Sequence, residues 1–255
     1  MARLTVVAEK AAMSEAAAER ITSRIEAAIA QRGMAAISLT GGDTPDLLYE
    51  YLADERRAWK RRIDWPRLHV FWGDEREVPP DHEQSNYGLA HRLLLQHVNV
   101  PETQIHRMRG ELPASDAGRL YDAVLRARRD QTAGPLFDVM LLGIGSNAHI
   151  ASIFPASPLL AERSERLGRF ATGVAVPELS QWRITMTPAA LLDAAAIVMI
   201  ASGPSKAAAI AAAIEAPENV EKYPAQLLRE ADPADRVEWI IDAAAAARLR
   251  GAPRA

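Results

Sequence analysis

The sequence contains no cysteine among its 255 residues. That absence excludes disulfides, thiolate metal ligands and cysteine nucleophiles, and it is typical of proteins from a reducing cytoplasm. Long apolar runs are missing too, because Glu9 and Lys10 interrupt the short apolar stretch near the N-terminus. We therefore expect a cytoplasmic protein with no membrane partner, either a monomer or a small homo-oligomer.

The chain also lacks a strong excess of either charge, since 30 basic and 33 acidic residues give a net charge of −3. The net charge of the chain does not favour binding of a polyanion, so we expect no nucleic-acid partner. It is compatible with binding of a small anion. One basic cluster lies on a predicted helix with Trp59 as its only aromatic residue, which favours a solvated helix face over a nucleic-acid contact. The cluster consists of Arg56, Arg57, Lys60, Arg61 and Arg62.

Alternating strand and helix patterns run along the chain, and 49% hydrophobic composition is ample for a buried core. This alternation predicts an α/β fold with a mainly parallel sheet covered by helices on both faces. The predicted strands cover residues 4–7, 35–39, 68–72, 137–142, 184–186, 197–201 and 237–241. The predicted helices cover residues 11–31, 45–59, 85–97, 116–129 and 206–214, with a short alanine-rich helix after residue 241.

Four loops carry the unusual residues, and each follows a predicted strand. They read TGGDTP, GDERE, GIGSNAH and SGPSK, after residues 39, 72, 142 and 201. Ligands of such sheets bind beyond the carboxyl ends of the strands, so we expect these loops to form the site.

The first loop combines Gly41 and Gly42 with Thr44 and Pro45, which suit the start of a helix. Its N–H groups could hold a phosphate, although the loop lacks the Lys-Ser/Thr pair of a P-loop, so an ordinary turn and cap is the alternative. For the phosphate interpretation, Asp43 must point away.

Three cations are candidates for binding an anion. Arg76 lies among acids, which could position it for bidentate contact or form a surface salt-bridge cluster. Lys206 begins a predicted helix, where an ammonium opposes the helix dipole unless an anion is near. Arg183 begins a predicted strand, and the alternative interpretation is that it is an ordinary surface arginine.

His149 follows a glycine-rich stretch at an expected strand-to-helix turn, where it could be a base, a metal ligand or a capping residue. The stretch matches the dinucleotide pattern Gly-x-Gly-x-x-Ala. Pro155 would break the required helix, however, and no acidic residue ends a strand about twenty positions later. No second ligand stands at helical spacing from His149, and no Gly-x-Ser-x-Gly elbow occurs. A general base is favoured, with a capping histidine as the alternative.

Taken together and in order, five stretches resemble the 6-phosphogluconolactonases. That family typically shows Ser-Gly-Gly-Ser-Thr-Pro, Asp-Glu-Arg-x-Val-Pro with Ser-Asn-Tyr, Gly-Met-Gly-x-Asp-Gly-His-Thr-Ala-Ser-Leu-Phe-Pro, Arg-Ile-Thr-Leu-Thr and a late Gly-x-x-Lys. Here the stretches read TGGDTP, DEREVPPDHEQSNYGLA, GIGSNAHIASIFP, RITMTPAALLDAA and GPSK. The similarity covers nearly the whole chain and implies one Rossmann-like domain over residues 1–255.

The resemblance implies hydrolysis of 6-phospho-D-glucono-1,5-lactone without metal or cofactor, with His149 activating water. A neutral histidine can do so near its ordinary pKa of about 6.5. The related glucosamine-6-phosphate deaminases are the rival enzymes, but they usually continue the histidine motif with Ala-Phe-Asn-Glu-Pro, which is absent here. A non-catalytic sugar-phosphate-binding relative is the other alternative.

By family position, the substrate phosphate would contact Arg76, Arg183, Lys206, Gly41, Gly42 and Thr44, while Asp74, Glu75 and Asn86 lie near the site. Two departures from the pattern stand out. Asp43 replaces a small polar residue, and Asn147 with Ala148 replaces Asp-Gly before the histidine. An asparagine can orient the imidazole but cannot stabilise it with a charge or shuttle a proton.

Overall fold

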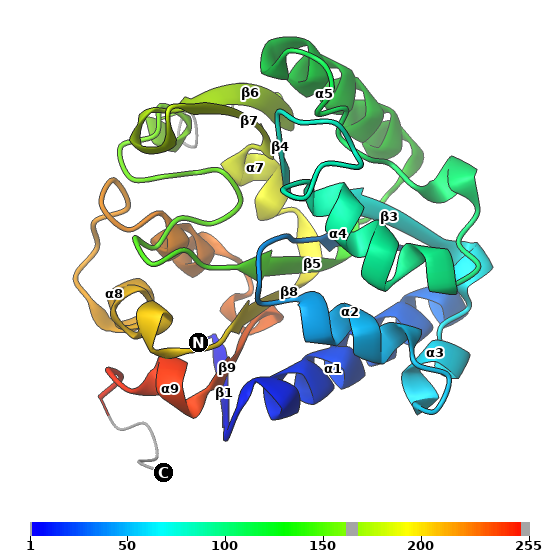
Figure 1. Ribbon diagram of the computed structural model, residues 1–255, viewed down its shortest axis with the longest axis horizontal. Helices are drawn as coiled ribbons and strands as arrows, with labels where there is room; N and C mark the ends of the chain where they lie inside the picture. The colour runs from blue at the N-terminus through cyan, green and yellow to red at the C-terminus, as the bar shows by residue number, and fades with distance from the viewer. Residues whose placement is uncertain (1, 162–167, 251–255) are drawn as a thin grey trace.

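A six-stranded parallel sheet forms the centre of the computed structural model, which describes residues 2–161 and 168–250. Every neighbouring pair of its strands runs parallel, as the alternating pattern predicts (Figure 1). In spatial order the strands are β1 (Arg3–Val7), β9 (Val237–Asp242), β8 (Ala194–Ala201), β5 (Phe137–Gly143), β2 (Ala35–Leu39) and β3 (Leu68–Trp72).

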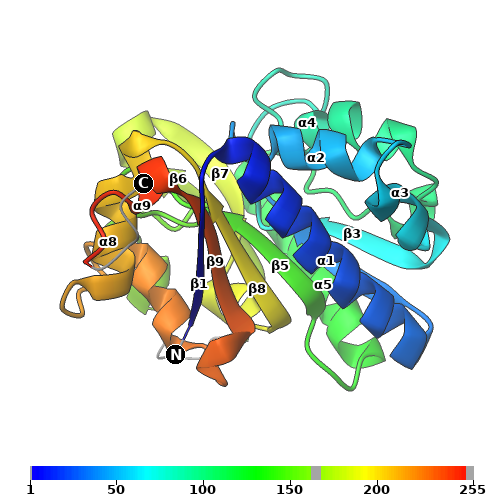
Figure 2. The same cartoon turned by 90° about the horizontal axis from the view of Figure 1, so that it is seen from below.

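Both faces of this sheet are buried, because successive side chains of a strand point to opposite faces. Val139 and Leu141 of β5 pack into a cluster with helices α1 (Lys10–Arg32) and α2 (Asp46–Ala53). Met140 and Leu142 pack into the opposite cluster with α5 (Ala114–Gln131) and α8 (Ala207–Glu215). Figure 2 shows α1 lying along one face of the sheet. The continuous apolar run of β5 therefore reflects burial on two sides.

A second, smaller sheet was not expected from the sequence. It consists of β4 (Asp74–Arg76), β7 (Gln181–Met186) and β6 (Ala171–Val176), all paired antiparallel. Met186 donates its N–H to the carbonyl of Gly73 at 2.8 Å, which ties this sheet to the end of β3. Of this sheet, the sequence predicted only part of β7. It did not predict β4, because that strand is short and charged and gives no periodic signal.

Two predicted helices are interrupted. The helix predicted over 45–59 is divided into α2 and α3 (Ala58–Arg62), because Asp54 is extended and its side chain accepts from the Arg56 N–H at 2.9 Å. The helix predicted over 85–97 is α4 (Asn86–Leu93) followed by a 3-10 turn. After β9 comes the expected alanine-rich helix, α9 (Ala243–Ala246). None of the helices in the two described ranges is long and apolar enough to cross a membrane.

The order of the strands reverses between β2 and β5. From β2 the chain moves outward to β3, then returns across β2 to β5 and continues to β8 on the other side. Such a switch point leaves a crevice at the carboxyl ends of the strands, where ligands of this kind of sheet bind. The four loops singled out from the sequence follow β8, β5, β2 and β3, which are consecutive in the sheet.

Candidate active site

A cavity of about 270 Å³ lies at this crevice. All four loops contribute to it, so the sheet brings together segments separated by more than 160 positions in the sequence. Its lining residues are Thr40, Gly41, Gly42, Asp43, Thr44, Asp74, Arg76, Asn86, Gly143, Ile144, Gly145, Ser146, His149, Ala151 and Lys206.

His149 lies partly buried against this cavity, with its ring stacked on Phe154 at 4.0 Å between centroids and 14° between planes. On its other side the imidazole approaches the backbone of Gly145 so closely that a Cβ there would lie 2.1 Å from ring atoms. Any side chain at Gly145 would therefore displace the ring.

The hydrogen bonds of His149 determine which ring nitrogen carries the proton. The backbone N–H of His149 donates to Oδ1 of Asn147 at 3.2 Å, and Nδ1 of the ring lies 2.6 Å from the same oxygen. An oxygen that accepts from a backbone N–H is a carbonyl, so we assign the proton of the neutral imidazole to Nδ1. Nε2 then keeps a free lone pair, as a general base requires.

Burial lowers the pKa of His149 to about 4, below its ordinary value of 6.5. Asp74 acts in the opposite direction, while the positive charges of Lys206, Arg183 and Arg76 add to the lowering. The imidazole is consequently neutral at pH 7.

The loop that carries His149 is not the strand-to-helix turn expected from the sequence. No helix begins within residues 144–158, which form turns and short bridges instead. Ala148 adopts φ 66°, the left-handed region that favours glycine, and its side chain is fully buried. This is the position at which the 6-phosphogluconolactonase pattern has glycine, so the alanine here carries backbone strain.

Asp74 lies at the edge of the cavity with both carboxylate oxygens engaged. Oδ2 accepts from the hydroxyl of Ser152 at 2.6 Å, and Oδ1 accepts from the amide of Asn86 at 3.1 Å. Asn86 in turn sits against Gly41, where a Cβ would lie 1.7 Å from its Oδ1. Gly41 thus allows Asn86 to approach the first loop. Ser152 was missed in the sequence because an isolated serine without a nucleophile motif carries no signal.

Glu75, another acid of the second loop, binds backbone N–H groups and a hydroxyl rather than the guanidinium of Arg76. Glu75 is buried and accepts from the N–H groups of Arg76, Asn86 and Tyr87 and from the Ser85 hydroxyl. Burial raises the pKa of Glu75, and these four donors oppose that rise. Glu75 therefore attaches β4 to the start of α4, which is a structural role.

The three candidate cations have few acceptors of their own. Within the described residues, none of Arg76, Arg183 and Lys206 has a carboxylate within 4.0 Å of its charged nitrogens. Arg76 donates to the carbonyl of Gln84, and Nη2 of Arg183 donates to Gln181 at 2.8 Å. Nε and Nη1 of Arg183 are buried without a partner.

Of these cations, Arg76 and Lys206 line the cavity, whereas Arg183 does not. Arg183 is the direct partner of Arg76 across β4 and β7, and its charge reaches His149 from there. Lys206 precedes α8 as predicted, and burial lowers the pKa of its ammonium.

Two expectations for the first loop are wrong. Thr44 does not cap α2, since Pro45 occupies the cap position and no side chain bonds there. Asp43 lines the cavity instead of pointing away from it, and its charge partly offsets the lowered pKa of Lys206. This placement weakens the case for a phosphate at the first loop, because the carboxylate would repel it. Gly42 has φ 83° and lines the cavity, in agreement with a tight turn at a ligand site.

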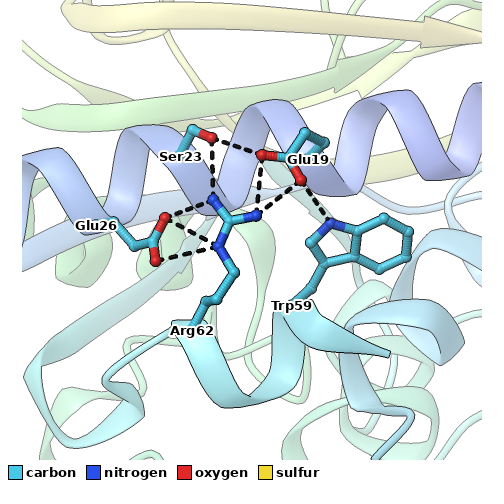
Figure 3. Close-up of polar contacts among 5 residues, drawn as sticks. All are labelled: Glu19, Ser23, Glu26, Trp59 and Arg62. Carbon is cyan, nitrogen blue, oxygen red and sulfur yellow. Dashed lines mark hydrogen bonds and ion pairs between the residues drawn. The ribbon is translucent and has the colours of Figure 1, made fainter. Parts of the chain in front are cut away.

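The basic cluster lies elsewhere, on α3 and the two residues before it, and two of its members, Arg57 and Arg62, pair with acids of α1. Figure 3 shows the guanidinium of Arg62 between Glu19 and Glu26, at 2.7 and 2.6 Å. The indole of Trp59 donates to Glu19 at 3.0 Å, and Arg57 pairs with Glu15 at 2.9 Å. These ion pairs join α3 and the residue before it to α1, so this part of the cluster packs between two helices rather than forming a fully solvated face.

The fold and the cavity define a class of α/β protein that has a polar pocket with two cations, two carboxylates and a histidine at the switch point of a parallel sheet. A family model described as glucosamine-6-phosphate isomerases/6-phosphogluconolactonase matches residues 8–239, and the chain belongs to that family.

Relatives and a solved structure agree with this assignment. A 6-phosphogluconolactonase of Mycobacterium bovis is 38% identical over 245 residues, covering 92% of this chain and 93% of the relative. One from Synechocystis sp. is 34% identical over 254 residues, covering 97% and 98%. The solved 6-phosphogluconolactonase of Trypanosoma brucei superposes with a TM-score of 0.83 at 27% identity, covering 98% of this chain and 99% of that chain.

Proposed function

We propose that this protein hydrolyses 6-phospho-D-glucono-1,5-lactone to 6-phospho-D-gluconate, the oxidative-branch step of the pentose phosphate pathway. The observation that carries the proposal is the imidazole of His149, held through Nδ1 by Asn147 on the wall of a cavity that Arg76 and Lys206 also line. Within residues 2–161 and 168–250, neither cation has a carboxylate within 4.0 Å of its charged nitrogens. Family membership supplies the substrate, since relatives named 6-phosphogluconolactonase match nearly the full chain. We treat residues 1–255 as one catalytic domain, because two core clusters share one sheet.

In this proposal, Nε2 of His149 takes a proton from water as the water oxygen attacks the lactone carbonyl carbon. The resulting tetrahedral oxyanion collapses by breaking the bond from that carbon to the ring oxygen. The imidazolium returns its proton to the ring oxygen, which becomes a hydroxyl, and the acid product ionises. Asn147 holds the ring during both transfers by accepting from Nδ1.

The phosphate would be held by Lys206 and Arg76 with the N–H groups of Gly41 and Gly42 and the Thr44 hydroxyl, all on the cavity wall. Arg183 would contribute through Nε and Nη1, which have no hydrogen-bond partner among the described residues and lie beside Arg76. Charge-assisted hydrogen bonds of this kind contribute about 1.5–3 kcal/mol each. Asp74 and Asn86 would contact or orient the sugar, since both line the same cavity.

The deaminase alternative is less well supported by the residues after the histidine. Ser152 binds Asp74 and Phe154 stacks on the imidazole, so neither position supplies a carboxylate for opening a sugar ring. A binder without turnover is distinguished by assay.

The direct test is acid release from freshly prepared 6-phosphogluconolactone at constant pH, corrected for spontaneous hydrolysis. His149→Ala should lower the enzyme-dependent rate by roughly two to four orders of magnitude, which is the range for loss of a general base. His91→Ala, at an exposed histidine of α4, is the matched control and should retain the rate. Saturable binding without acid release would instead identify a non-catalytic relative.

A further inference from the structure

Glu178 reaches the loop that bears His149 from a different part of the fold. It lies on the 3-10 turn Pro177–Leu179, which connects β6 to β7 in the small antiparallel sheet. Its Oε2 accepts a hydrogen bond from Nδ2 of Asn147 at 3.0 Å. A continuous chain therefore runs from the ring of His149 through the amide of Asn147 to the Glu178 carboxylate.

The amide at the middle of this chain has to be an acceptor on one side and a donor on the other. Oδ1 of Asn147 receives Nδ1–H and the backbone N–H of His149, while its NH₂ group faces the carboxylate. Asparagine meets both demands without a proton shared between acids. An aspartate at 147 would place two carboxylates at hydrogen-bond distance, where one must take up a proton or move away.

This complementarity accounts for the departure from the Asp-Gly-His pattern at Asn147. Position 147 has no carboxylate, but its hydrogen-bond partner Glu178 does. A carboxylate beside the NH₂ group polarises the amide, which strengthens its oxygen as an acceptor for Nδ1–H. Glu178 itself is exposed, so its carboxylate reaches Asn147 from the surface of the molecule.

We propose that Glu178 is a positioning residue that holds the Asn147 amide with its oxygen toward His149, and so keeps the ring proton on Nδ1 and the lone pair on Nε2. The catalytic meaning of this arrangement rests on the proposed function, because it requires His149 to be the base. The arrangement itself is a property of the unliganded protein.

Removing the carboxylate tests the proposal in two independent ways. Glu178→Ala should lower kcat about three- to tenfold with little change in KM, because Glu178 is not among the residues that line the cavity. Glu178→Gln keeps an oxygen that accepts from Asn147, so it should recover kcat to within about twofold of the natural chain. The exposed Glu218 provides a control, and Glu218→Ala should change neither constant.

The second readout needs no substrate. Nitrogen-15 NMR of the imidazole should find the proton on Nδ1 in the natural chain, and a mixture of the two neutral tautomers in Glu178→Ala. If Glu178→Ala keeps both the tautomer and kcat, the positioning role is refuted while lactonase activity stands. If the natural chain shows no lactonase activity, the proposed function fails, and the tautomer shift still tests Glu178.

A double-mutant cycle completes the test. With Asp at 147, Gln at 178 can donate to the new carboxylate, whereas Glu at 178 repels it. We expect the double variant Asn147→Asp with Glu178→Gln to have a kcat at least three times that of Asn147→Asp alone. In the natural background, Glu178→Gln should not raise kcat. An effect of Glu178→Gln that is the same in both backgrounds would overturn the pairing.

Discussion

Two groups of cations in this molecule are built in opposite ways. At the contact of α1 with α3, Arg62 lies between Glu19 and Glu26, and Arg57 is paired with Glu15. At the crevice, two of the acids are bound to other groups: Asp74 to Ser152 and Asn86, and Glu75 to backbone N–H groups and the Ser85 hydroxyl. Asp43 also lines the cavity, and its charge acts on Lys206 without forming an ion pair within 4.0 Å. The cations there have no ion pair among the described residues.

The difference shows what each group does. A paired arginine at the surface has satisfied donors and contributes modestly to stability. Buried donors without acceptors cost about 1–3 kcal/mol each, so a fold keeps them only where something else accepts from them. Arg183 is 8% exposed and has two such donor atoms. Arg183 lies beside Arg76 rather than on the cavity wall, so its unpartnered donors support our proposal that an anion binds at this end of the sheet.

Among the changes that compare the two groups of cations, removing a crevice cation should have the largest effect. Lys206→Ala should lower kcat/KM for 6-phosphogluconolactone about 10- to 100-fold, which corresponds to the loss of one charge-assisted hydrogen bond. Unphosphorylated gluconolactone should lose less than about threefold, because it carries no phosphate. Steady-state kinetics on both lactones measure the two losses.

Arg62→Ala is the matched control for that experiment, since it removes an equal charge from the paired group. It should leave kcat/KM for both lactones unchanged. Equal losses on both substrates in Lys206→Ala would show that the ammonium does not bind the phosphate.

The second effect concerns pH. Because burial and the crevice cations lower the pKa of His149 to about 4, the base stays deprotonated down to that pH. We expect kcat/KM to be flat from about pH 7 to 5 and to fall as the pH drops through about 4. Gluconolactone is the better substrate for this profile, because it has no phosphate that titrates. Lys206→Ala should move the fall to higher pH, since a positive charge is removed.

An acid limb near the ordinary histidine pKa of about 6.5 would contradict this assignment. It would mean that His149 is solvated in the working enzyme, or that another group is titrating.

Much of this contrast could be predicted from the sequence, and the reasons differ by region. The apolar run of β5 and the turn residues after it are local signals, and they correctly located the loop of His149 at the carboxyl edge of the sheet. The prediction that this loop leads directly into a helix was wrong, because Ala148 adopts a backbone angle that its residue type disfavours. Partners such as Ser152 and Glu178 were missed, since their contacts bridge 78 and 31 positions.

The smallest effect is on stability. Arg62→Ala should lower the free energy of unfolding by about 1 kcal/mol, the upper end for exposed pairs, and reduce Tm by roughly 2–4 °C. The Arg62 guanidinium, with Trp59 and Ser23, holds the pKa of Glu19 at about 2, below its ordinary value of 4.5. The stabilisation from the ion pair between Arg62 and Glu19 is therefore present above about pH 4.5 and is lost as the pH falls toward 2.

Thermal unfolding of the natural chain and Arg62→Ala at pH 7 and pH 3 measures this contribution. The difference in Tm should shrink at the lower pH. A difference that is unchanged by acid would show that packing of the Arg62 stem, rather than its charge, joins the two helices.

The most direct test of the contrast is a titration of the unliganded protein with inorganic phosphate at pH 7, followed by backbone amide NMR. We predict saturable shifts confined to residues 40–44, 73–76 and 203–206, with residues 56–62 unchanged. Shifts at residues 56–62, or no saturable shift at the crevice, would contradict the claim that the unpaired cations form the anion site.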